Sequence, residues 1–156
     1  MRLSELLSEE RVAIRHSDAS RPLDKPATIK LLAAMLAAGA RVPVEVVERV
    51  LGEREQLQST GIGEGVAIPH GALPQLESQF ASLLLVPEGV EFQAIDGLNV
   101  NILFAVITPK RATGEHLKTL ARVSRLLRNK GFRERLVAAP SPKEAYALIS
   151  TEEGDR

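Results

Sequence analysis

The sequence predicts an α/β protein in which helices cover both faces of a single β-sheet. Two apolar runs, residues 81–86 (ASLLLV) and 100–108 (VNILFAVIT), are nearly uninterrupted, as in strands that are buried on both faces. Segments with helical spacing of apolar residues lie before and after these runs. Because such a sheet needs cover on both sides, we expect a three-layer α/β/α sandwich.

The first third of the chain predicts two short elements followed by two helices. Residues 3–7 are expected to form a short helix, and residues 11–15 (RVAIR) alternate between polar and apolar as in a strand. Asp24 can cap a helix that Gly39 ends. Pro43 suits the first turn of a second helix.

The rest of the chain predicts a loop, further strands and three helices. Residues 58–65 (QSTGIGEG) contain three glycines and two hydroxyl residues, so we expect a loop that leads into a short strand at 66–68. Thr113 can cap a long helix, and a short helix is expected at residues 132–138. The capping box at residues 141–144 (SPKE) opens a last helix.

Length and composition indicate one soluble domain over residues 1–156. The apolar fraction of 44% is enough for one core, and the absence of cysteine excludes disulfides, thiolate metal sites and thiol nucleophiles. The N-terminus (MRLSELLSEE) lacks the pattern of a signal peptide, and the longest apolar stretch is too short to span a bilayer. We therefore expect a cytoplasmic protein without membrane insertion.

Charge is balanced over the chain but unevenly distributed. The formal net charge is zero, whereas residues 110–135 contain nine Lys or Arg and two Glu. One interpretation of this basic segment is a solvated helix face, and the other is a surface for an anionic partner. Nucleic acid is the weakest candidate for that partner, because few aromatic residues are available for stacking.

His70 is the strongest candidate for a reactive side chain. In VAIPHG, Pro69 stiffens the chain before the imidazole, and Gly71 leaves room for a partner to approach. The preceding loop offers backbone N–H groups and the hydroxyls of Ser59 and Thr60, which are groups that bind phosphate oxygens. The alternative is a histidine that merely closes a turn.

The other two histidines differ from His70 in kind. His16 follows the first strand and is expected to be an exposed loop residue. His116 lies in the first turn of the helix that begins near Thr113, on the stripe that includes Leu120. It is either a satisfied core histidine or a neutral imidazole that donates an N–H to an anion at the helix N-terminus.

Other motifs do not support a cofactor or a metal. The glycines of residues 61–65 do not match GxGxxG, and no GxxxxGK[ST] or GxSxG is present. No spacing of histidine and carboxylate residues suggests zinc. We expect neither a cofactor nor a metal site.

Two runs, Glu53-Arg54-Glu55 and residues 59–71 (STGIGEGVAIPHG), resemble the fructose/mannitol-type IIA domains of the bacterial phosphoenolpyruvate phosphotransferase system. The spaced pattern from Glu55 through Gly71 is specific to that family. Residues 92–97 (FQAIDG) and the segment from His116 onward resemble its nitrogen-related branch, whose members lack fused sugar-transport domains. We expect the same of this chain.

The resemblance implies a mixed sheet sandwiched by helices, and a phosphoryl group that arrives from the phosphohistidine of an HPr- or NPr-type carrier protein. His70 matches the phosphorylated histidine, His116 the second active-site histidine, and Arg54 the arginine beside it. Glu64 lies where the family has a polar or acidic residue, and Thr60 is carried over as a loop hydroxyl.

These assignments predict a transfer reaction that needs no metal. The neutral imidazole of His70 is expected to attack phosphorus in line, while Arg54 binds the equatorial oxygens and His116 donates a hydrogen bond. The phosphorylated protein would either act on regulatory protein targets or pass the phosphoryl group to a IIB domain for sugar uptake. The lack of a transport domain favours regulation.

Overall fold

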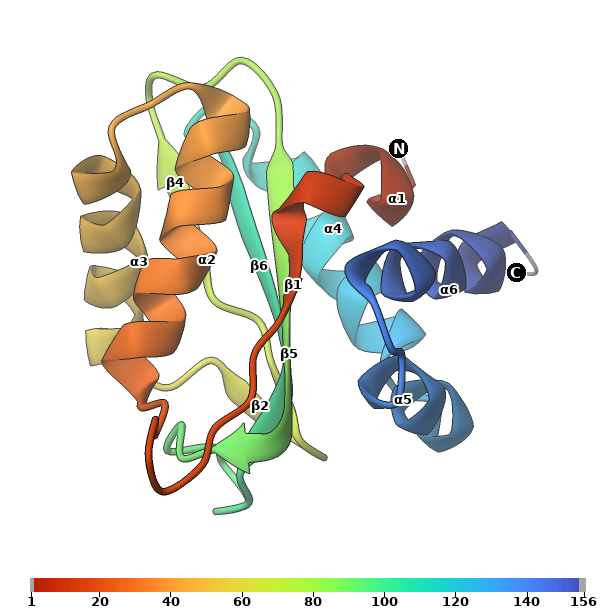
Figure 1. The fold of residues 1–156 in the computed structure, drawn as a ribbon. Coiled ribbons are helices and arrows are strands. Elements are labelled where there is room, and N and C mark those ends of the chain that lie inside the picture. The colour runs from red at the N-terminus through yellow and green to blue at the C-terminus, as the bar shows by residue number, and fades with distance from the viewer. Residues whose placement is uncertain (1, 155–156) are drawn as a thin grey trace.

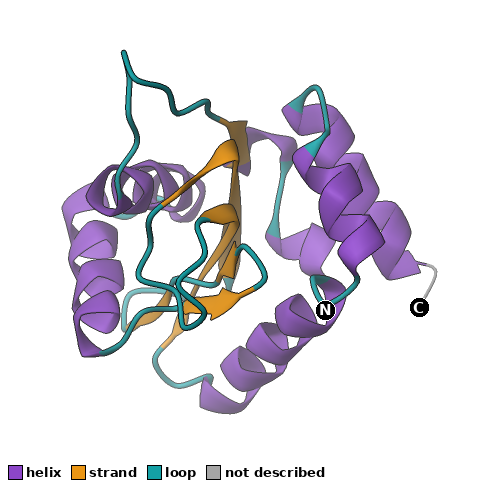
Figure 2. Ribbon diagram, turned by 90° about the horizontal axis from the view of Figure 1, so that it is seen from below, coloured by secondary structure: helices purple, strands orange, loops and turns teal. Residues whose placement is uncertain are grey.

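The computed structural model describes residues 2–154, which form the expected three-layer sandwich. Helices α2 and α3 cover one face of the sheet, and α1, α4, α5 and α6 lie on the other (Figure 1). Figure 2 shows the strands between these two helical layers from a second direction. The elements are α1 (Leu3–Leu6), η1 (Glu9–Arg11), β1 (Val12–Ile14), α2 (Lys25–Ala40), α3 (Val44–Leu57), β2 (Gly61–Gly63), β3 (Val66–Ala67), β4 (His70–Leu73), β5 (Phe80–Val90), β6 (Val100–Pro109), α4 (Thr113–Leu126), α5 (Lys130–Val137) and α6 (Pro142–Gly154).

The sheet is mixed, with strand order β1-β5-β6-β3-β2. Strand β1 is parallel to β5, β5 is antiparallel to β6, and β3 is parallel to β6. Strand β4 also pairs with β6, in parallel and further along it, so that His70 lies opposite Val106. The expectation of a mixed sheet is thereby confirmed.

Strands β5 and β6 form the buried centre, as their apolar runs predicted. Their side chains alternate between two cores: Leu83, Ile102 and Phe104 pack beneath the α1, α4, α5 and α6 layer. Leu84 and Leu103 face α2 and α3 instead. Both faces of these strands are removed from water, which explains why their sequences lack polar alternation.

Several element boundaries differ from those expected. Helix α2 runs past Gly39 to Ala40, and the left-handed residue at its end is Arg41, with a φ of 58°. Gly39 instead makes room for the Arg11 side chain, because a Cβ would lie 2.6 Å from Arg11 Nη1. The Asp24 cap is confirmed, since its carboxylate accepts the amide of Ala27 at 2.9 Å.

Three local features differ from the prediction. The segment expected to be all loop contains β2, in which glycine is required by contact: a Cβ on Gly61 would lie 2.8 Å from that of Ala94. Thr113 does not cap α4: Ala112 is the N-cap residue, and its carbonyl accepts the amide of His116 at 3.0 Å. The strand β4 was also missed, because Pro69 interrupts the pattern between β3 and β4.

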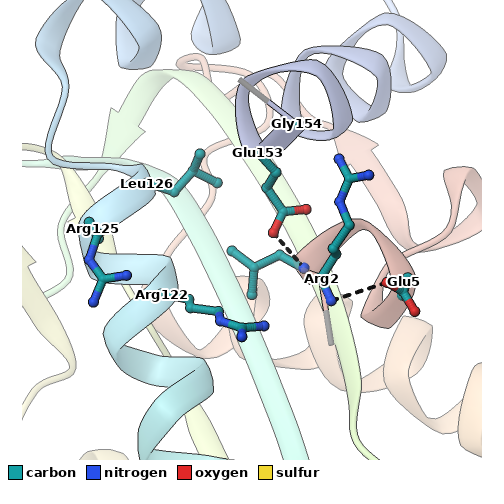
Figure 3. Close-up of a pocket in the computed structure, with 8 residues that line it drawn as sticks. Arg2, Glu5, Arg122, Arg125, Leu126, Glu153 and Gly154 are labelled. Atoms are coloured by element: carbon teal, nitrogen blue, oxygen red, sulfur yellow. Dashed lines mark hydrogen bonds between the residues drawn. The ribbon is translucent and has the colours of Figure 1, made fainter. Parts of the chain in front are cut away.

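The two ends of the described chain are joined at a cleft between α1, α4 and α6 (Figure 3). The Glu153 carboxylate accepts the amides of Leu3 at 2.6 Å and Ser4 at 2.8 Å. Arg2 Nη2 donates to the carbonyl of Ser150 at 2.7 Å. These contacts satisfy backbone groups at the start of α1 and fix it against α6. Within residues 2–154, no helix combines the length and apolarity needed to cross a membrane.

Candidate functional site

A cleft of about 350 Å³ lies where the end of α3, the segment before β2 and helix α4 meet. It contains several residues singled out from the sequence, including His70, Arg54, Ser59 and Thr60. Its lining residues are Arg54, Gln58, Ser59, Thr60, Gly61, Ile62, Ile68, His70, Ile95, Leu120 and Ser124. The cleft therefore joins both helical layers across the edge of the sheet.

The imidazole of His70 is held in one tautomer. Its Nδ1 lies 2.7 Å from the carbonyl oxygen of Ile68, and a carbonyl can only accept, so Nδ1 carries the proton. The other nitrogen, Nε2, then has a free lone pair, and the Nε–H of Arg54 donates to it at 3.3 Å. The nitrogen that has the lone pair is thus Nε2, a point that the sequence left open.

The environment of His70 also keeps the ring neutral. Burial lowers the pKa of His70 below its ordinary value of 6.5, and the hydrogen bond to Ile68 opposes this shift. The charge of Arg54 lowers the pKa further, while the charge of Glu55 raises it. Since the net direction is downward, the lone pair on Nε2 is available at neutral pH.

His116 lies beside His70, although it comes from the first turn of α4 on the other side of the sheet. The ring centroids are 5.4 Å apart, with an angle of 52° between the planes. Burial, together with the charge of His70, lowers the pKa of His116 to about 4. Its Nδ1 is buried and has no hydrogen-bond partner among the described residues. The expectation of a satisfied core histidine therefore does not fit this side chain.

Arg54 is fixed on one side and open on the other. Its Nη1 donates to the carbonyl of Gln58 at 2.8 Å, and its Nε donates to His70. A guanidinium carries more N–H groups than these two contacts use, which leaves donors for an anion in the cleft. Arg54, His70 and His116 thus form one cluster with a cation and two neutral imidazoles.

The two hydroxyls of the loop have structural partners instead. Ser59 Oγ donates to the carbonyl of Phe92 at 2.7 Å and accepts the amide of Gly61 at 3.1 Å. Thr60 is 3% exposed, and its hydroxyl donates to the carboxylate of Glu55. This placement corrects the expectation that both hydroxyl protons are available for phosphoryl oxygens.

Glu64 lies away from the cleft around His70. It has a φ of 60°, its side chain is 76% exposed, and its carboxylate pairs with Arg133 Nη2 at 3.2 Å. A second pocket, formed with α5, contains both side chains. The expectation that Glu64 contributes to phosphoryl binding is therefore not favoured by its position. His16 is exposed, as expected, and its Nδ1 lies 2.8 Å from the carboxylate of Glu88.

Three groups at the site had not been assigned a role from the sequence. They are the carbonyls of Ile68 and Gln58, and the buried carboxylate of Glu55. Backbone carbonyls leave no signal in side-chain identity, so sequence reasoning could not find the first two. Glu55 could be noticed only as part of the family pattern. Among the described residues, no cluster of three or more histidine and carboxylate side chains could hold a metal ion.

Two exposed aliphatic side chains line the cleft, and a third is the neighbour of His116 in the chain. Ile62 and Ile95 line it and are 48% and 79% exposed, and Leu117 follows His116 and is 61% exposed. Large apolar side chains gathered next to a polar site are typical of a surface that contacts another protein. The site is therefore suited to a reaction partner that is itself a protein.

Comparisons with known proteins identify the family of this chain. The family described as "Phosphoenolpyruvate-dependent sugar phosphotransferase system, EIIA 2" matches residues 5–152. A nitrogen regulatory protein from Bradyrhizobium diazoefficiens is 36% identical over 126 residues, which cover 81% of this chain and 82% of the relative. One from Escherichia coli K12 is 36% identical over 131 residues, covering 83% and 80%. The crystal structure of the nitrogen regulatory protein IIA-Ntr from Neisseria meningitidis superposes with a TM-score of 0.85 at 29% identity, covering 94% of this chain and 98% of that one.

Proposed function

We propose that His70 Nε2 is the atom that accepts and releases the phosphoryl group. The chain belongs to the EIIA 2 family of the phosphoenolpyruvate-dependent sugar phosphotransferase system, in which phosphoryl transfer is the shared chemistry. The observation that carries this proposal is the hydrogen bond from His70 Nδ1 to the Ile68 carbonyl at 2.7 Å. It leaves the lone pair on Nε2, within 3.3 Å of the Arg54 guanidinium. A neutral nucleophile beside a cation suits attack on a phosphoryl group.

The transfer balances without a metal or an added base. A new N–P bond forms at His70 Nε2 as the N–P bond of the donor phosphohistidine breaks, and the donor nitrogen keeps the electron pair. The donor ring, protonated at its other nitrogen, leaves as a neutral imidazole. The His70 ring becomes the phosphorylated imidazolium, and its proton stays on Nδ1, which continues to donate to the Ile68 carbonyl. Two chemically similar rings exchange roles, so the reaction is close to thermoneutral and reversible.

Arg54 and His116 stabilise the charge that moves between the rings. As Nε2 begins to bond to phosphorus, the Arg54 N–H that caps its lone pair is released to the equatorial oxygens. Neutral His116, 5.4 Å away by ring centroid, adds a neutral hydrogen-bond donor on the other side. Its buried Nδ1 lacks a partner among residues 2–154, which supports a role that is completed only when a ligand is present.

The protein partner that delivers the group is an HPr- or NPr-type carrier. The exposed side chains of Ile62, Ile95 and Leu117 offer an apolar contact around the cleft that would exclude water during transfer. The guanidinium of Arg54 in the cleft favours an anionic phosphoryl group on the partner.

We infer the role of the phosphorylated protein from the relatives to which the chain is similar. The chain is a phosphocarrier similar to nitrogen regulatory proteins, and we favour control of regulatory protein targets through the phosphorylation state of His70. The second candidate is donation to a IIB domain for sugar uptake, which the family description motivates. Transfer from the labelled protein to a purified IIB domain would favour the second role.

The test of the proposal is incubation of the protein with a phosphorylated HPr-type carrier, followed by intact mass and localisation of the modified residue. One phosphoryl group on His70 is expected, and phosphorus–nitrogen coupling in an NMR spectrum should place it on Nε2. Labelling of His116 or of Nδ1 instead would contradict the assignment.

A further inference from the structure

A buried ion pair lies beneath the segment that leads into β2. Lys25 Nζ is 2.8 Å from Glu55 Oε2, and the side chains are only 17% and 6% exposed. Lys25 opens α2, whereas Glu55 is in the last turn of α3, so the pair joins two helices. The cost of desolvating a buried ion pair offsets much of the attraction between its charges, so the pair by itself says little about stability. Its further contacts indicate what it does.

The Glu55 carboxylate fixes one loop residue by two groups. The amide of Thr60 donates to both carboxylate oxygens, at 3.1 and 3.2 Å, and the hydroxyl of Thr60 donates to one of them. The Lys25 ammonium on the other side also lies 4.5 Å from the centroid of the Phe92 ring. Thr60 is therefore anchored by a charged group that has its own fixed partner.

Thr60 in turn determines the position of the peptide that holds His70. Its carbonyl accepts the amide of Ile68 at 3.0 Å, and the carbonyl of the same Ile68 accepts His70 Nδ1–H at 2.7 Å. Hydrogen bonds linked through the backbones of Thr60 and Ile68 thus connect the Glu55 carboxylate with the ring nitrogen that carries the proton. A displacement of Thr60 would displace the Ile68 acceptor.

The same loop restrains the other side of the imidazole. Gln58, two residues before Thr60, provides the carbonyl that accepts Arg54 Nη1 at 2.8 Å. Arg54 then donates to His70 Nε2. Both nitrogens of His70 consequently depend on the conformation of residues 58–60, which Glu55 anchors.

We propose that Glu55, charge-balanced by Lys25, is a positioning residue for phosphoryl transfer, which acts through Thr60 to present the lone pair of His70 Nε2. The proposal rests on the proposed function of His70. Glu55 contacts neither the ring nor the phosphoryl group. Of the charged and titratable groups near the imidazole, Arg54 and His116 flank it directly, and the charge of Glu55 raises the pKa of His70 against the effect of burial.

The experiment compares Glu55→Gln with the wild-type chain in two measurements. Nitrogen NMR of labelled histidine reports the His70 tautomer, and phosphorylation by an HPr-type donor at several concentrations separates docking from transfer. The wild type is expected to show the Nδ1–H form alone. In the variant we expect a mixture of tautomers and a rate at saturating donor that is lower by roughly 10- to 100-fold, with little change in the half-saturating donor concentration.

Two further variants guard against a folding defect. Glu55→Gln combined with Lys25→Met removes the orphaned ammonium while keeping an apolar stem over Phe92, and it should show the same tautomer mixture. Thr60→Val keeps the side-chain shape and removes the hydroxyl, and a smaller shift in the same direction is expected. The matched control is Glu53→Gln, which makes the same charge change on an exposed residue of the same helix.

Retention of a single tautomer and of the wild-type rate in Glu55→Gln and in the double variant would overturn the proposal. A wild-type protein that is not labelled on His70 would instead overturn the proposed function. The tautomer measurement needs no donor, so it decides the positioning role in either case.

Discussion

His70 and His116 lie side by side in space but are held in opposite ways. Both nitrogens of His70 have partners, Ile68 on one side and Arg54 on the other. His116 has a buried Nδ1 with no partner among the described residues, and a pKa lowered to about 4. The comparison indicates that one ring is restrained to present a lone pair, whereas the other has hydrogen-bonding capacity left for a ligand.

The largest expected effect comes from removing the restrained ring. His70→Ala should abolish phosphorylation by an HPr-type donor, because it removes the imidazole whose Nε2 lone pair is held beside Arg54. Intact mass after incubation with the phosphorylated carrier is the measurement, with circular dichroism to verify folding. Complete labelling of the variant would transfer the role of acceptor to another residue.

Loss of the cation should be next in size. Arg54→Ala removes the charged donor at Nε2, and we expect transfer to slow by roughly 100- to 1,000-fold, as for the loss of one oxyanion donor. Rapid-quench rates of labelling would measure this. Arg54→Lys, which retains the charge without the second contact to Gln58, should recover part of the rate. A rate for Arg54→Ala close to wild type would remove the arginine from the reaction.

A smaller effect is expected at the second ring. His116→Ala should still accept the phosphoryl group but roughly 10-fold more slowly, since only one neutral hydrogen-bond donor is lost. The same rapid-quench assay applies. If His116→Ala is labelled as fast as the wild type, the contrast between the two rings has no catalytic meaning.

The lowered pKa of His116 also predicts a dependence of stability on pH. Between pH 6.5 and about 4, the unfolded chain binds a proton that the folded His116 does not, so the free energy of unfolding falls as pH falls. His116→Ala should flatten this dependence within that window. Urea unfolding at several pH values would measure it, and unchanged curves would show that His116 is not the group responsible.

The smallest effect is expected outside the cleft. Glu64→Gln weakens an exposed pair with Arg133, so stability should change by about 0.5 kcal/mol or less and the rate of labelling should stay within twofold. Urea unfolding and the labelling assay together provide the test. A large loss of rate would restore the role that the sequence suggested for this glutamate.

The central elements could be predicted from the sequence because the surroundings of their side chains are uniform or local. The apolar runs of β5 and β6 are buried on both faces, and the caps at Asp24 and Ser141 are local contacts within one turn. Errors arose where distant contacts decide. Gly39 does not end α2, because its role is to admit Arg11, and Gly61 belongs to a strand because it lies against Ala94.

The sequence by itself determined the fold class, the apolar centre of the sheet and the candidate residues His70, His116 and Arg54. Only the tertiary structure decided that these three meet in one place, which nitrogen of His70 has the lone pair, and that Lys25 balances Glu55 beneath the loop. The physical reason is that periodicity and capping act between neighbours in the chain. The tautomer and the ion pair instead depend on carbonyls and charges brought together from separate elements, and those leave no pattern in the order of residues.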